Sequence, residues 1–541
     1  MTTETNQTLP SQENTIENTF QNIQENTQNH TPDSVPITMP QSVPAPFYKT
    51  ETIRQIVESF VPFGLASFLY GIFFCFCLYR NVKGITSPLL TVGTLAFYLY
   101  SFHRLGITCP VPKKLFYGIS IFLLGLSNML TSSGILIFLN YVGIILLLFC
   151  FLLQHFYETK KWDFSKYLGS LLKTIFCSIG NIGYPFKSFG IYLKQRQTEK
   201  SRRLYSVFLG ILISIPLLAV VGSLLLSADA VFRHFSDRLF ADLLEQIKFG
   251  NLFLMAFLVL FGIMASYGIL IELAGEDIND EIKDRRTMEP VVAITFTLIL
   301  TVIYLAFSVI QIMYLFIGNM QLPDGYTYAA YAREGFFQLL FVCLINLCLV
   351  LFCMKHYQDN KILKGILTVI CGCTYIMIAS STMRMILYIQ TYNLTFLRLF
   401  VLTALFVLLL CLTGVVISIY KEAFPLFSFM MTVVTATYLV FSLARPDSII
   451  ASYNIANSNI HDVYLYELSM DAVPVMEEAG FFDDVEVTHD SCREVDRFDP
   501  YFRNAEHYVR YIQSEYDRMT LRTFNLSVYR AGRAVCAHVI Q

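Results

Sequence analysis

The sequence predicts an all-α protein, a polytopic transmembrane helical bundle of about eleven spans with a small, mainly helical extramembrane domain at its C-terminus. The 541 residues are 55% hydrophobic and 15% charged, with a mean hydropathy of +0.53, whereas soluble domains carry about a quarter charged residues. The apolar residues cluster in uncharged runs of roughly 18 to 25 residues, the length that crosses a hydrocarbon core. From Ala444 onward the chain is charged and aromatic instead, and it contains no further run of this kind.

The chain divides into four predicted regions. Residues 1–47 are polar and contain no Lys or Arg, which predicts a disordered tail. Residues 48–204 hold the N-terminal membrane helices and a basic loop, 205–443 a C-terminal membrane helix bundle, and 444–541 an extracytoplasmic domain. We expect spans at 60–79, 86–103, 115–131, 134–154, 205–226, 251–273, 291–317, 336–354, 362–380, 396–419 and 424–443, with the ninth continuing helically to about Thr391.

The orientation is predicted from the Lys and Arg residues of the loops. Segment 155–204 contains ten Lys or Arg against three Asp or Glu, which is typical of a cytoplasmic loop. Alternation of the spans then places the N-terminus in the cytoplasm and the C-terminus outside. Arg80 and Lys83 are the exception, because this orientation puts them on the outer side.

The same basic segment, 155–204, interleaves its lysines with Trp, Tyr, Phe and Leu. One interpretation is an interfacial helix that lies along anionic lipid headgroups of the inner leaflet. The other is an ordinary cytoplasmic loop that packs its apolar groups on the bundle. The bilayer is the expected partner in both cases, and the net charge of −2 gives no support for nucleic-acid binding.

Unusual polar residues gather near one predicted membrane face, the outer one. A charge at the middle of a membrane helix costs about 2.5 to 3.5 kcal/mol, so each needs a partner or water. The candidate cluster consists of Asp229, Arg233, Arg333, Glu334, Arg384, Tyr388, Tyr392, Arg398, Arg445 and Asp447.

Arg384, Tyr388 and Tyr392 of this cluster are spaced to share one helical face. They predict an outer cavity lined by an Arg and two phenols, with Glu334, Asp229 or Asp447 as the partner of Arg384. The alternative is that the arginines extend to headgroups while the tyrosines belong to the interfacial aromatic belt.

Several strings in the second half of the chain resemble a known signature set. They are Tyr331-Ala-Arg-Glu-Gly-Phe-Phe-Gln338, Arg384-x3-Tyr388-x3-Tyr392-Asn-Leu-Thr-x2-Arg398, Ala444-Arg-Pro-Asp-x4-Ser-Tyr-Asn-Ile455, Leu468-Ser-x-Asp-Ala-Val-Pro474 and Arg522-x-Phe-Asn-Leu-Ser527. Together they resemble the bacterial membrane protein families described as domains of unknown function four-one-five-three and four-one-seven-three, over residues 205–530. The resemblance implies a bacterial cell-membrane protein and supplies no established activity. The chain departs from the pattern at Asn393, where Gly is expected, and at Ser452, where Arg is more usual.

Catalytic templates are missing from the sequence. It contains no Walker-type Gly loop, no His-Glu-x-x-His and no Gly-x-Ser-x-Gly. The cysteines lie mostly within apolar runs as small hydrophobes, so we expect no metal and no cofactor. The missing templates leave enzymatic activity uncertain and rank a membrane enzyme acting at the outer face third, behind the two classes of function below. Cys492 and Cys536 are the two cysteines of the C-terminal domain, and an oxidising compartment would favour a disulfide between them.

Two classes of function remain. The first is transport or handling of a small molecule or lipid at the outer membrane face, which the polar cluster and the polar residues Asn140, Gln311 and Asn346 within spans favour. The alternative is a membrane sensor, scaffold or regulatory subunit that uses its external C-terminal domain.

Overall fold

The structure is a computed structural model in which the part of the chain from residue 48 to 541 forms one compact unit. It describes residues 50–107, 112–157, 162, 164–195, 249–275, 286–313, 336–457, 464–488 and 504–540, together with six single positions between 207 and 225. The predicted tail, 1–47, lies outside the described residues, as does most of the fifth predicted span.

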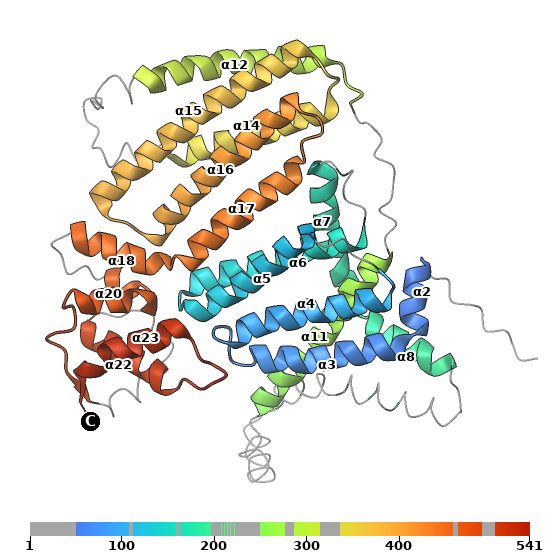
Figure 1. Cartoon of the computed structure of the whole chain (residues 1–541), viewed down its shortest axis with the longest axis vertical. Helices are drawn as coiled ribbons and strands as arrows, with labels where there is room; N and C mark the ends of the chain where they lie inside the picture. Colours follow the sequence, from blue (N-terminus) through green and yellow to red (C-terminus); the bar gives the residue numbers. More distant parts are fainter. Residues whose placement is uncertain are drawn as a thin grey trace, which may run out of the picture. The chain divides into compact units, whose positions relative to one another are not determined.

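The first group of helices combines contacts between neighbours in the chain with contacts between helices far apart in it. α3 lies against α4 and α11, and α5 lies between α4 and α6 (Figure 1). The members are α2 (Glu51–Glu58), α3 (Phe60–Leu78), α4 (Thr86–Arg104), α5 (Pro112–Leu130), α6 (Gly134–Phe156), α7 (Phe164–Gly180), α8 (Tyr184–Gln195) and α11 (Phe249–Gly275).

The second group surrounds the long helix α15, which contacts α12, α14 and α16. Its members are α12 (Pro290–Ile312), α14 (Phe336–His356), α15 (Lys361–Tyr392), α16 (Phe396–Tyr420) and α17 (Leu426–Leu443). Local signals define several starts: Pro290 occupies the first turn of α12, and the Asn360 side chain accepts hydrogen bonds from the N–H groups of Ile362 and Leu363. α17 then packs on α5 and so joins the two groups.

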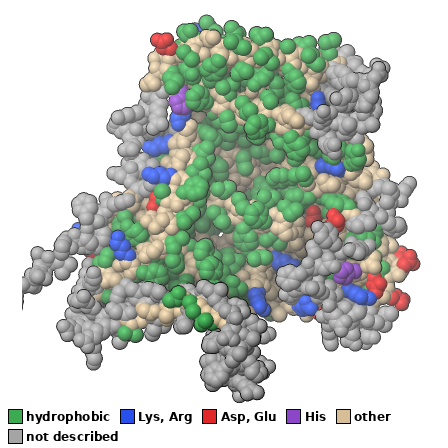
Figure 2. Space-filling model, turned by 180° about the vertical axis from the view of Figure 1, so that it is seen from behind, with side chains coloured by type: hydrophobic (Ala, Val, Ile, Leu, Met, Phe, Trp, Pro, Cys, Tyr) green, Lys and Arg blue, Asp and Glu red, His purple; other side chains and the backbone are tan. Residues whose placement is uncertain are grey.

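The helices confirm the predicted fold class of a polytopic membrane bundle. Among the described residues, eight helices are long and apolar enough to cross a membrane, while Leu115–Leu130 is apolar but shorter. Hydrophobic side chains cover the broad middle of the face shown in Figure 2, and Lys, Arg, Asp and Glu lie mainly toward its sides. The exact count of eleven spans stays a prediction.

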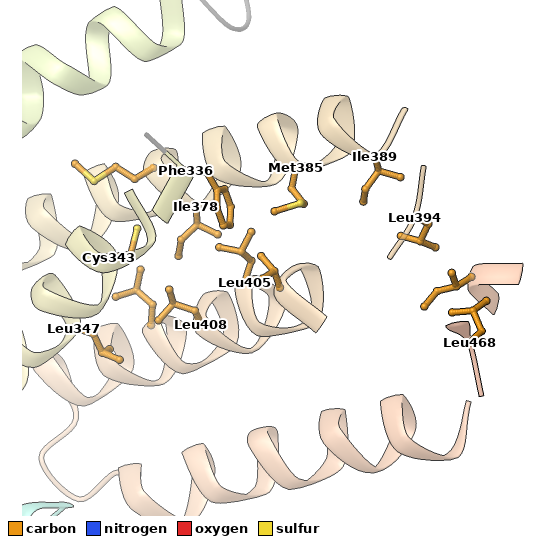
Figure 3. Packing of buried hydrophobic residues seen from close by; sticks show 14 of the residues in the cluster. Phe336, Cys343, Leu347, Ile378, Met385, Ile389, Leu394, Leu405, Leu408 and Leu468 are labelled. Atoms are coloured by element: carbon orange, nitrogen blue, oxygen red, sulfur yellow. The ribbon is translucent and has the colours of Figure 1, made fainter. Parts of the chain in front are cut away.

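The chain after α17 forms short elements that pack on one end of the bundle. They are α18 (Pro446–Asn457), α19 (Tyr464–Glu467), η4 (Met470–Ala472), α20 (Val473–Glu478), β1 (Val487–Thr488), α22 (Ala505–Asp517), α23 (Leu526–Val535), η5 (Cys536–His538) and β2 (Val539–Ile540). The two strands pair in parallel. One continuous hydrophobic cluster runs from Cys343 and Leu405 in the bundle through Leu394 to Leu468 and Val528, and Figure 3 shows its bundle part. The separate status of 444–541 as a domain, like the boundary at residue 204, therefore stays a prediction.

α17 shows that two other parts of the chain lie at opposite ends of the spans. Near its start, Phe427 stacks on Tyr167 of α7 with ring centroids 3.9 Å apart. Near its end, the Ser442 hydroxyl lies 2.6 Å from that of Ser127, beside the C-terminal elements. An 18-residue helix is about 27 Å long, so α7 and the C-terminal elements lie at different ends of α17.

Candidate functional site

The structure describes six of the ten residues of the predicted polar cluster. Asp229, Arg233, Arg333 and Glu334 lie outside the described residues. The other six members lie on or next to α15, α16 and α18, near one end of the bundle. Arg384 is 7% exposed within α15 and Asp447 is 4% exposed within α18.

Arg398 organises the turn between α15 and α16. Its guanidinium lies 4.2 Å from the ring centroid of Tyr388 and donates to the backbone carbonyls of Tyr392 and Asn393. The rings of Tyr388 and Tyr392 meet edge to face, with their centroids 5.1 Å apart. A cation is favoured both at a helix C-terminus and over an aromatic ring. Arg398 is therefore the cation that the structure places on these tyrosines.

Asn393, where the resemblance predicted Gly, adopts a backbone that favours Gly. Its φ is 65° and its ψ is 171°, a region that residues with a Cβ rarely enter. The next residue, Leu394, is held by the buried side chain of Asn454, which accepts from the Leu394 N–H at 2.8 Å and donates to the Leu394 carbonyl at 2.9 Å. The turn after α15 is thereby fastened to α18.

A second polar region joins residues 522–527 to the loops 79–86 and 128–132, and we call it the C-terminal joint. Arg522 donates to the carbonyls of Phe76 at 3.1 Å and Tyr79 at 2.8 Å, the last carbonyls of α3. The Arg522 carbonyl accepts from the Asn81 side chain at 3.1 Å, and Ile85 N–H donates to the Phe524 carbonyl at 2.9 Å. This end of α3 is thus capped by residues more than four hundred positions later in the chain.

Asn525 is a fully buried side chain of the C-terminal joint, with no exposed surface. Its amide donates to the carbonyls of Asn128 at 3.2 Å and Thr131 at 2.8 Å, both at the end of α5. Its side-chain oxygen accepts from the Val528 N–H at 3.1 Å, which caps the start of α23. Nearby, the Ser132 and Ser527 hydroxyls lie 3.0 Å apart.

From the C-terminal joint a buried hydrogen-bond network continues into the bundle. Asn140 of α6 donates to the Asn128 side chain at 2.8 Å and accepts from Tyr438 and Ser442 of α17, each at 2.8 Å. The Asn128 amide in turn donates to Ser87 of α4 at 3.1 Å. A buried network with satisfied members fixes one arrangement of the helices that contribute to it.

Asp471 is the buried carboxylate of this region, at 2% exposed. One of its oxygens accepts from the Thr131 hydroxyl at 2.5 Å, next to the C-terminal joint. Burial raises the pKa of Asp471, the charge of Asp447 adds to that rise, and hydrogen bonding from Ser527 and Thr131 and the charge of Arg445 oppose it.

Arg80 and Lys83, the exceptions to the predicted charge pattern, have partners at this end. Lys83 lies 3.3 Å from Glu515 of α22, and Arg80 donates to the Asn251 side chain at 2.7 Å. Both residues therefore have partners in the folded chain. The orientation was predicted by counting Lys and Arg in the loops, which takes no account of such contacts.

The sequence predicted the tyrosine face but not the C-terminal joint. Two signals for the joint were present: Asn128 and Asn140 interrupt apolar runs, and Arg522 and Asn525 belong to one of the family-like strings. Neither signal shows which residues these side chains contact. The predicted disulfide gains no support, since Cys536 is a free, exposed thiol and Cys492 lies outside the described residues.

The apolar helices and the buried polar network between them define a polytopic helical integral membrane protein. Residues 118–479, more than half of the chain, match the family described as Domain of unknown function (DUF4153), and the chain belongs to this family. No curated protein and no solved structure matches the chain. Within the described ranges, no three His, Cys, Asp or Glu side chains converge as a metal site.

Proposed function

We propose that this chain is a membrane sensor or regulatory subunit that works by opening and closing the C-terminal joint between its C-terminal residues and its N-terminal helices. The C-terminal joint carries this proposal, because Arg522 and Asn525 fasten residues 522–527 to the ends of α3 and α5. The network through Asn128 and Asn140 extends the connection to α6 and α17. A force or ligand acting on the C-terminal elements would thereby bias how four membrane helices pack.

The test is to lock the C-terminal joint with a reversible disulfide. Ser132→Cys with Ser527→Cys suits this purpose, because the two hydroxyl oxygens are 3.0 Å apart. In cells that lack the native gene, the oxidised double variant is expected to lose complementation of the deletion phenotype and to regain it on reduction. Ser132→Cys alone, under the same oxidant, is the control. Full complementation by the locked chain would refute regulation through this joint.

The proposed location is a bacterial cell membrane, with the N-terminus in the cytoplasm and the C-terminus outside. The basic segment and the C-terminal elements lie at opposite ends of α17, which supports this topology. A reporter fused after Gln541 is expected to be extracytoplasmic, and one fused at residue 180 cytoplasmic. A cytoplasmic signal from the first fusion would contradict the orientation.

A second candidate function is the handling of a small molecule or lipid at the end of the bundle that carries Arg398. It is favoured by one observation: Tyr392 is 52% exposed beside a guanidinium that stacks on Tyr388. An exposed ring and a cation at a bundle end suit an anionic headgroup. Arg398→Gln is expected to abolish such handling while Arg445→Gln preserves it, and equal loss in both variants would count against this candidate.

A further inference from the structure

Helix α7 presents two different faces, one to the bundle and one outward. The first packs against α6, α11 and α17 through the buried residues Tyr167, Leu171, Thr174 and Ser178. The second is apolar and exposed, and consists of Leu168 at 41%, Leu172 at 46%, Phe176 at 67% and Ile179 at 62% exposed. An exposed apolar stripe of this length on a bundle-packed helix needs a nonaqueous surface to cover it.

The lysines of α7 occupy a third side of the same helix. Lys166 and Lys173 are seven positions apart and therefore project in nearly the same direction, away from both the buried and the apolar residues. Lys166 Nζ lies 5.3 Å from the Trp162 ring, and in α8 Lys187 Nζ lies 5.0 Å from the Tyr184 ring. Residues 164–195 contain four Lys and no Asp or Glu, so this surface has one sign of charge.

The position of α7 suits a helix at the membrane surface. It lies at the end of the spans opposite the C-terminal joint, where Tyr157 donates to the Leu273 carbonyl at 2.6 Å and Asn181 donates to Glu272 at the end of α11. In Figure 1, α7 runs across the direction of α5, α6 and α17 rather than along it. Its apolar face and its lysines thus lie at the level where the spans end.

We propose that α7 and the start of α8 form a binding surface for anionic phospholipid headgroups, with Leu172 and Phe176 inserted among the acyl chains. The lysine side chains then project toward the headgroups while the buried face stays on the bundle. A basic residue near an anionic bilayer surface adds about fivefold to affinity, so Lys166, Lys173 and Lys187 together correspond to about a hundredfold preference over neutral lipid.

Trp162 provides a direct probe, because it is the single Trp of the chain and its ring centroid lies 5.3 Å from that of Tyr167 in α7. The full chain would be reconstituted in phosphatidylcholine vesicles doped with either brominated phosphatidylglycerol or brominated phosphatidylcholine at equal mole fraction. The brominated anionic lipid is expected to quench Trp162 more strongly, and added salt is expected to reduce the difference.

The matched variants are Lys166→Gln, Lys173→Gln and Lys187→Gln combined, and Lys364→Gln alone. The triple variant is expected to be quenched equally by the two lipids. Lys364 pairs with Asp359 at 2.8 Å next to the start of α15, away from α7, so its variant is expected to keep the preference. Comparing two lipids within each variant cancels the effect of Lys166 on Trp162 emission itself.

Three outcomes would overturn the proposal. Absence of quenching by either lipid would show that α7 does not lie at the bilayer. Equal quenching of the wild-type chain would show that the surface does not select anionic headgroups. A preference that survives in the triple variant would assign the selection to other residues.

Discussion

Replacing Asn525 with Ala tests the C-terminal joint at a fully buried side chain. The change removes the cap of α23, which costs about 1 kcal/mol, and it removes the donor to the Thr131 carbonyl, where a stranded buried acceptor costs about 1 to 3 kcal/mol. The Asn128 carbonyl loses less, because the Gly84 N–H still lies 3.4 Å away. Asn525→Ala is therefore expected to destabilise the joint by about 2 to 4 kcal/mol.

Limited proteolysis in detergent measures this loss. When cleavage is slow relative to reclosing, its rate follows the population of the opened joint, and 3 kcal/mol corresponds to about a hundredfold faster release of C-terminal fragments. Asn504→Ala is the matched control, since Asn504 also caps a helix by accepting from the His507 N–H, yet it is exposed. Its expected acceleration is about fivefold. Equal acceleration in the two variants would show that Asn525 acts as a cap alone.

Three further predictions concern single side chains. Because burial raises the pKa of Asp471 above its unfolded value, its contribution to stability is full below about pH 4 and is lost as the pH rises through the raised pKa. The unfolding temperature of the Asp471→Asn variant is therefore expected to rise relative to that of the wild type as the pH rises. Unfolding temperatures that change with pH in the same way in both proteins would contradict this. Asn393→Gly is expected to stabilise the chain by about 1 kcal/mol through release of backbone strain, and Asn393→Ala to destabilise it, in the same thermal assay; an unchanged midpoint for the Gly variant would remove the strain argument. Arg384→Ala is expected to lower membrane abundance, because the sequence predicts that the buried Arg384 pairs with a carboxylate, and stranding that carboxylate costs about 3 to 5 kcal/mol. Arg384→Lys is expected to restore only part of the abundance. Wild-type abundance of both variants would favour the alternative, in which Arg384 extends to lipid headgroups.

The spans were predictable because their signal is local. A run of apolar residues long enough to cross a bilayer cannot remain in water, so the predicted segments at 134–154 and 396–419 coincide with α6 and α16 within a few residues. The extension of the ninth span to about Thr391 is confirmed by α15, which ends at Tyr392. The start of α18 at Pro446 follows from the fixed φ of proline at a first helical turn.

The polar contacts were predictable only within one helix. A spacing of four residues places Tyr388 and Tyr392 together on one helix. It does not show which basic side chain, from beyond the following turn, contacts their rings. In the structure this side chain is Arg398, whose guanidinium lies over the Tyr388 ring, while Arg384 is buried within α15. Likewise, the pairing of Asn81 with Arg522 leaves no periodic pattern in either segment, because it depends on how all the intervening helices pack.

The C-terminal joint also determines when the protein can finish folding during synthesis. The side chain of Asn81 and the carbonyl that it binds are 441 positions apart, so the ribosome must translate nearly the whole chain before the end of α3 acquires its cap. Every span between them has to be inserted in the correct order beforehand. A chain that stalls or is truncated before residue 522 leaves the carbonyls of Phe76 and Tyr79 without the hydrogen bonds from Arg522.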